Sequence, residues 1–180
     1  VVSPLACQEM SNFLESKSAE GIAVGGVSMN VINAPSYSET RYLWPKRLFL
    51  QLGSRPGSLT IAGQNTTVAN VDRNWQTEWL PGGCTMWSWK IISANPQTPI
   101  NTRYAALEDV IFSYPLHRKN KFFVCASARC EIDLKADIRS NIAYISFKQT
   151  VARLYFCASN RNLSVILSIL STVTFHALQL

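Results

Sequence analysis

The chain has 180 residues, of which 47% are apolar and only 16% are charged, and its net charge at neutral pH is +6. This length is enough for one domain with its own core and no metal or disulfide staple, and the composition excludes intrinsic disorder, which requires low hydrophobicity and high charge. Because charged residues fall well below the usual quarter, we expect surplus apolar surface that is buried against other copies or another partner.

The first predicted element in chain order is a short amphipathic helix over residues 4–17. Ser3 suits its N-cap, and Pro4 suits the first turn, where no amide donor is needed. Its apolar stripe is formed by Leu5, Met10, Phe13 and Leu14. We therefore assign residues 1–20 to an N-terminal helical arm.

Most of the following chain has the pattern of short strands. The segments are rich in β-branched and aromatic residues, and turn residues separate them at intervals of roughly ten residues. The predicted strands lie at 22–32, 47–53, 58–63, 74–79, 84–93, 121–127, 129–137, 141–147 and 150–158. The segment 102–112 fits a helix or a strand. We predict one all-β domain over residues 1–180, a sandwich or jelly-roll-like fold with the short N-terminal helix.

The C-terminal stretch, residues 163–180, contains no Asp, Glu, Lys or Arg. A membrane helix must be considered for 18 uncharged residues. Its three serines, two threonines, histidine, glutamine and many β-branched residues argue against that interpretation. We predict an apolar strand region that is buried or packed against a neighbour, and no membrane contact.

Four of the five tryptophans lie between residues 74 and 92. With Pro81-Gly82-Gly83 as a three-residue loop, a hairpin places all four on one face, whereas a two- or four-residue loop separates them. The three-residue loop is favoured because it leaves a polar opposite face. A core or subunit interface is the favoured role, and a glycan-stacking platform is the alternative. The four residues are Trp75, Trp79, Trp87 and Trp89.

Basic residues are dispersed except for one knot at residues 117–121. Basic side chains on one surface can contact phosphates without sequence specificity. A solvated basic turn with no partner is the alternative interpretation. The predicted contacts with nucleic acid or another anion are His117, Arg118, Lys119 and Lys121.

No motif for catalysis, a metal or a cofactor is present, and we predict none of the three. The five cysteines include no C-x-x-C pair, so a zinc site is not supported. A hairpin at Ser127-Ala128 would allow a Cys125–Cys130 disulfide, but free buried thiols are favoured because Ser-Ala suits such a loop poorly. Glu131 and Asp133 could form a carboxylate pair, although simple alternation of exposed acids with buried apolar residues explains them equally.

These features predict a non-enzymatic structural subunit that self-assembles through apolar β surfaces as a homo- or hetero-oligomer. Its most concrete version is a viral coat (capsid) protein, located in a virion or outside the cell. The first alternative is a secreted or surface glycan-binding β-sandwich that uses the tryptophan hairpin. The second alternative is a hydrolase built on the paired carboxylates.

Overall fold

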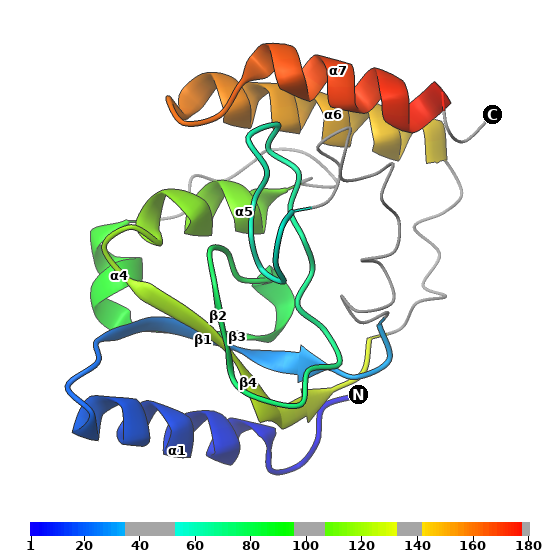
Figure 1. Cartoon of the computed structure of the whole chain (residues 1–180). Helices are drawn as coiled ribbons and strands as arrows, with labels where there is room; N and C mark the ends of the chain where they lie inside the picture. The colour runs from blue at the N-terminus through cyan, green and yellow to red at the C-terminus, as the bar shows by residue number, and fades with distance from the viewer. Residues whose placement is uncertain (35–52, 96–106, 133–141, 178–180) are drawn as a thin grey trace.

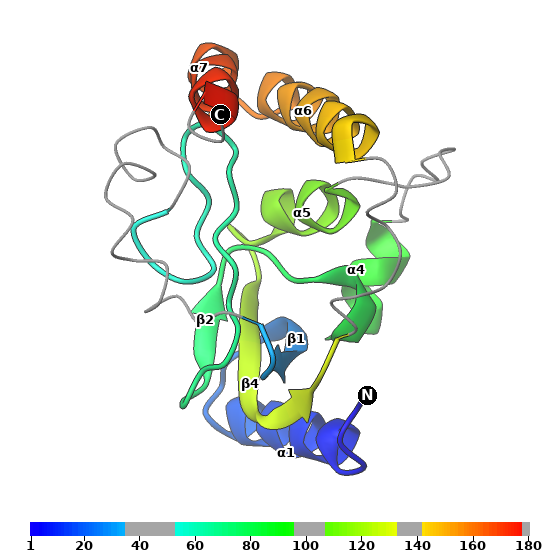
Figure 2. The same cartoon turned by 90° about the vertical axis from the view of Figure 1, so that its right-hand side faces the viewer.

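The computed structural model describes residues 1–34, 53–95, 107–132 and 142–177. The helices are α1 (Ala6–Ala19), α4 (Trp89–Ala94), α5 (Glu108–Ser113), α6 (Ile142–Ser159) and α7 (Val165–Ala177). In Figure 1, α1 covers one face of a sheet, and α4 and α5 lie on the other face. Figures 1 and 2 show α6 and α7 side by side as a further layer beyond α5.

The sheet is mixed and has four strands in the order β2-β4-β1-β3. The strands are β1 (Val24–Val31), β2 (Trp75–Thr77), β3 (Thr85–Trp87) and β4 (Lys121–Cys130). The central strands β1 and β4 are parallel, and each edge strand pairs antiparallel with its neighbour. Short 3₁₀ turns precede β3 (Gly82–Cys84) and lie between α5 and β4 (Tyr114–Leu116).

The register of the central pair shifts at Asn30, which lies beside Arg129 although Met29 lies beside Cys125. At this shift the side-chain amide of Asn30 is buried and forms hydrogen bonds with backbone groups of two other segments. Its nitrogen donates to the carbonyls of Val71 and Ala126 at 2.9 and 3.3 Å, and its oxygen accepts from the Val71 N–H at 3.1 Å. A buried amide with its donors and acceptor used fixes one arrangement of the strands.

Each face of the sheet carries its own apolar cluster. On the α1 face, Met10 and Phe13 pack on Val27, and Phe13 meets Phe123 edge to face at 5.3 Å. On the other face, the clustered residues are Leu80, Trp87, Ile91, Phe112, Leu116 and Phe122. The alternation of Phe122 and Phe123 between the two clusters follows directly from the two-residue period of a strand.

The prediction of an all-β sandwich or jelly roll is wrong. The structure is mixed, with helices on both faces of one small sheet. The helix predicted at 4–17 is present as α1, but it has no side-chain cap from Ser3. The segment 102–112 contributes helix from Glu108 onward. The strand predicted at 47–53 lies almost wholly outside the described residues.

The strands predicted in the C-terminal third are the largest error. Segments 141–147 and 150–158 together form the single helix α6, and the strand region 163–180 is helical as α7 in its described part. The prediction relied on β-branched and aromatic content, which measures fit to a half-buried surface more than an intrinsic backbone preference. Tertiary packing decides whether such segments form strands or helices.

The tryptophan hairpin is also absent. Strands β2 and β3 occupy opposite edges of the sheet and do not pair, because β4 and β1 lie between them. After Trp87 the chain turns into α4, so Trp89 is helical. Similarly, residues 121–130 form one strand with no turn at Ser127-Ala128, and the Cys125–Cys130 hairpin does not exist.

Gly25 tests the packing of α4 on the sheet. A Cβ on this glycine would lie 2.6 Å from Ile91 Cδ1, 2.7 Å from Asn120 Cβ and 2.8 Å from Phe122 Cε1. We expect Gly25→Ala to lower the free energy of unfolding by about 1–3 kcal/mol through overpacking, measured by urea denaturation. The control is Gly83→Ala, which meets no atom within 4 Å and should change it by less than about 0.5 kcal/mol. Equal losses would contradict the close approach.

Candidate functional site

The C-terminal helices form an antiparallel hairpin joined by residues 160–164. The Ser164 hydroxyl accepts from the Leu167 N–H at 3.2 Å, which is the arrangement of a helix N-cap. The Ser164 N–H donates to the Ile61 carbonyl at 2.8 Å and ties the start of α7 to the turn at 60–64. This turn rises from the sheet side to meet the two helices (Figure 1).

The face of this hairpin that points away from the sheet is apolar. The exposed large apolar residues of α6 recur every four positions, and those of α7 follow the i, i+3, i+4, i+7 spacing of one helix face. Seven of the 14 exposed large apolar residues of the described chain are here: Phe147, Val151, Tyr155, Ile166, Ile169, Leu170 and Val173. We call these seven residues the outer face.

The inward side of α7 is polar, which reverses the usual arrangement. Ser168 and Ser171 are 0% and 1% exposed, whereas Ile166 on the outer face is 72% exposed. The Gln64 amide donates to the Ser171 hydroxyl at 3.2 Å. A helix of a soluble domain normally turns its apolar stripe toward the core. α7 therefore turns its serines toward the described core and leaves Ile166, Ile169 and Leu170 exposed.

Phe156 anchors the hairpin to the rest of the molecule. It is 1% exposed in a cluster with Trp79 and Val110, and its ring meets Tyr114 edge to face at 5.5 Å. The next residue, Cys157, packs closely against the turn at Gly63, where φ is +73°. The inward side chains Phe156 and Cys157 of α6 thus pack against the rest of the molecule, whereas those of the outer face are exposed to solvent.

Two titratable groups of α6, Arg153 and Cys157, point toward the rest of the molecule. Burial lowers the pKa of Arg153, against the opposing effect of Cys157, and burial raises the pKa of Cys157. Burial, followed by the charge of Glu78, raises the pKa of Tyr114. Among the side chains described on α6 and α7, no fully exposed one is charged. The outer face therefore has no charge of its own to oppose contact with an apolar surface.

The basic residues predicted from the sequence lie in the turn before β4 and at the first residue of that strand, Lys121. Arg118, Lys119 and Lys121 are exposed, and His117 is half-buried. The His117 ring stacks on Tyr114 at 4.6 Å, and its Nδ1 contacts the Tyr114 carbonyl. The structure brings the four residues together as a solvated basic turn, and contact with nucleic acid stays a prediction.

The four tryptophans do not share a face. Trp79 is buried, and Trp87 packs edge to face on Phe112 at 5.1 Å and on Phe122. Trp75 donates from Nε1 to the Pro56 carbonyl at 3.0 Å. Trp89 is exposed on α4. A platform that uses all four rings is not formed, because they belong to different elements and depths.

The other sequence candidates lie apart from the outer face. Glu131 is exposed directly after β4, and Asp133 lies outside the described residues. The thiols of Cys125 and Cys130 are free. Within the described parts of the chain, no group of three or more His, Cys, Asp or Glu side chains could hold a metal ion. In the same residues, no helix is both long and apolar enough to cross a membrane.

Compared with protein-family models, curated proteins and solved structures, the chain has no significant match. Function must therefore be inferred from geometry. Sequence reasoning missed the outer face because it treated residues 163–180 as a strand. The spacing of Ile166, Ile169, Leu170 and Val173 was the signal that could have revealed it, since these positions fall on one side of a helix.

Gly63 tests the attachment of α6. A Cβ on Gly63 would lie 2.6 Å from Cys157 Sγ, in addition to the strain of a positive φ. The matched control is Gly21, which has φ +71° and no atom within 4 Å of an added Cβ. We expect Gly21→Ala to cost about 1–2 kcal/mol of unfolding free energy, from backbone strain alone.

For Gly63→Ala we expect a further loss of about 1–3 kcal/mol from the clash with Cys157. Both values are measured by thermal and urea denaturation. Equal losses for the two variants would contradict the packing of α6 on this turn.

Proposed function

We propose that the protein is a non-enzymatic subunit that self-associates through the outer face of α6 and α7, with a second copy of the chain as its partner. The observation that carries this proposal is the reversed polarity of α7, whose serines are buried and whose large apolar residues are exposed. Contiguous exposed apolar surface on a soluble domain marks an interaction site.

The size of the outer face fits a partner of protein dimensions. Seven partly exposed large side chains offer apolar area on the order of several hundred Å². A stable interface buries about 800 Å² per partner. The outer face therefore supplies a large part of the area that a homodimer requires, and it is larger than a small-molecule contact needs.

The shape of the outer face fits a second copy in particular. Two antiparallel helices present a ridged, elongated surface, and a second such hairpin can pack on it as a four-helix bundle. A two-fold axis through the contact makes the same patch serve both subunits, as in most homodimers. The proposal revises the sequence prediction in one respect: the associating surface is helical instead of β.

Charge also favours a protein partner of this kind. Two copies that each carry a net charge of +6 repel one another, so the contact is most favourable where neither copy presents an exposed charge. An interfacial membrane helix typically carries many Lys and Arg residues on its polar face, whereas the polar side chains described on α7 are those of serine and threonine. No described feature favours the narrower prediction of a viral coat protein.

The test is a double substitution in the middle of the outer face, Ile166→Glu with Leu170→Lys. A Glu four residues before a Lys stabilises a helix, so the two substitutions should preserve α7 while they place two charges in the contact. We expect the unmodified protein to have at least twice the 20.1 kDa mass of one chain in sedimentation equilibrium. We expect the variant to be a monomer, with self-association weakened by at least about 100-fold because its charges would be buried.

The matched control is Leu5→Glu, since Leu5 is 64% exposed at the start of α1, on the far side of the sheet. This variant should associate like the unmodified protein. A monomeric unmodified protein at concentrations on the order of 100 µM, well above the Kd of a stable homodimer, would overturn the proposal. So would an unmodified protein that stays monomeric and sediments with phosphatidylcholine vesicles, because the outer face would then serve a lipid surface.

A further inference from the structure

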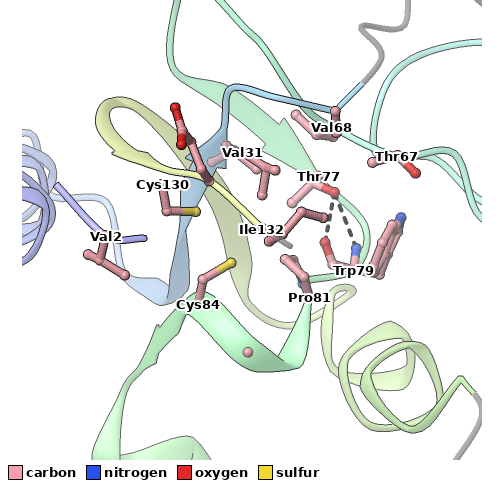
Figure 3. A pocket seen from close by; sticks show the side chains of 14 residues that line it. Val2, Val31, Thr67, Val68, Thr77, Trp79, Pro81, Cys84, Cys130 and Ile132 are labelled. Atoms are coloured by element: carbon pink, nitrogen blue, oxygen red, sulfur yellow. Dashed lines mark hydrogen bonds between the residues drawn. The ribbon is translucent and has the colours of Figure 1, made fainter. Parts of the chain in front are cut away.

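A second feature, separate from the outer face, is a cavity of about 330 Å³ at the end of the central strands. Figure 3 shows it between the ends of β1 and β4 and the segment that runs from Thr77 through the turn before β3. Its volume falls within the range of small-molecule sites. None of the seven residues of the outer face lines it.

The walls of the cavity are almost wholly apolar. Side chains of Val31, Val68, Trp79, Val124 and Ile132 line it. Ile132 is exposed although it forms part of a wall, so an occupant would remove apolar surface from water. A cavity with such walls favours a hydrocarbon group over a polar one.

Two polar side chains of the walls, Thr77 and Trp79, are already hydrogen-bonded within the fold. The Thr77 hydroxyl contacts the carbonyls of Gly57 at 3.0 Å and Trp79 at 2.8 Å. Trp79 donates its ring N–H to the Thr66 carbonyl at 3.2 Å. These groups do not require a polar ligand, because burying a polar group is unfavourable only when it lacks a partner.

Two cysteines line the cavity, Cys84 from the turn before β3 and Cys130 from the end of β4, and their sulfur atoms lie near one another (Figure 3). Burial, together with the neighbouring Cys84, raises the pKa of Cys130 to about 11. The Cys130 thiol is therefore neutral at physiological pH and behaves as a small apolar group. It adds no charge to the cavity.

We propose that this cavity binds a small uncharged ligand that is mostly hydrocarbon, such as an aliphatic alcohol. Among the described residues that line it there is no Lys, Arg or His, and one lining residue is the exposed Glu131. A ligand with its own carboxylate would have to lose its hydration among apolar walls, with the like charge of Glu131 among the lining residues. An uncharged head group meets neither obstacle.

The raised pKa of Cys130 predicts its reactivity. Raising the pKa from the ordinary 9.0 to about 11 lowers the thiolate fraction at pH 8 by about 100-fold, and only the thiolate reacts readily with alkylating agents. We expect the alkylation rate of Cys130 to keep rising about tenfold per pH unit between pH 9 and 10. Site-resolved mass spectrometry measures this rate, and a plateau near pH 9 would contradict a raised pKa.

The ligand test uses 1-octanol as the probe and Cys84 as the reporter. Alkylation of Cys84 by N-ethylmaleimide is measured by mass spectrometry as 1-octanol is added, with the exposed Cys7 on α1 as an internal reference. We expect 1-octanol to slow labelling of Cys84 and to leave Cys7 unchanged. Octanoate should protect Cys84 at least about tenfold less effectively, because its charge must be desolvated.

Variants place the effect in the cavity. Ile132→Asp adds a charge to a wall residue that is 45% exposed, and it should abolish protection by 1-octanol. Ile92→Asp on α4, where Ile92 is 38% exposed, should leave protection intact.

The proposal would be overturned if 1-octanol did not change the labelling of Cys84 in the unmodified protein. Equal protection by octanoate would overturn its uncharged ligand class. In the variant with Ile166→Glu and Leu170→Lys, 1-octanol should protect Cys84 as it does in the unmodified protein. The ligand test is therefore independent of self-association.

Discussion

The parallel pairing of β1 with β4 is the constraint on which the rest of the structure depends. The two strands are separated by about half the chain, and every other described layer is positioned by them. α1 packs on one face of the pair, and α4 and α5 pack on the other. The edge strands are three residues long, and within the described sheet each pairs only with β4 or β1 of this pair. The buried Asn30 amide fixes its register, and the cavity opens where the pair ends at Val31 and Cys130.

The two proposals concern different parts of the molecule, the outer face of α6 and α7 and the cavity at the end of β1 and β4. The hairpin of α6 and α7 attaches to the sheet through inward groups such as Phe156 and Ser171, and its apolar residues are left on the outside. Selection for solubility alone would replace exposed isoleucine and leucine with polar residues, so a protein partner explains them better. The cavity, in contrast, is small and lined by side chains that already form the fold. A surface for a second copy and a site for a small ligand can therefore operate without competing for residues.

The sequence predicted the parts of the fold that depend on local pattern. The helix α1 has an apolar stripe at helical spacing, β1 contains three valines, and β4 begins with a Phe-Phe-Val run after Lys121. The C-terminal helices were missed because Val, Ile and Thr at high density suggest strands, whereas the i, i+3, i+4 spacing of the same residues indicates a helix. The tryptophan pairing failed for another reason: strand order is non-local, and a turn at Gly82-Gly83 does not reveal that β4 and β1 lie between β2 and β3. The same spacing could have shown that the apolar residues of α7 share one side of a helix, but that this side is exposed depends on tertiary packing.

The most direct measurement of the central claim is hydrogen exchange at two protein concentrations, one far below and one far above the midpoint of association. The account predicts that amides of α6 and α7 exchange more slowly at the higher concentration, because a second copy covers the outer face, while those of α1 are unchanged. Exchange in α6 and α7 that does not depend on concentration would contradict it, and would mean that these apolar residues do not contact another copy of the chain.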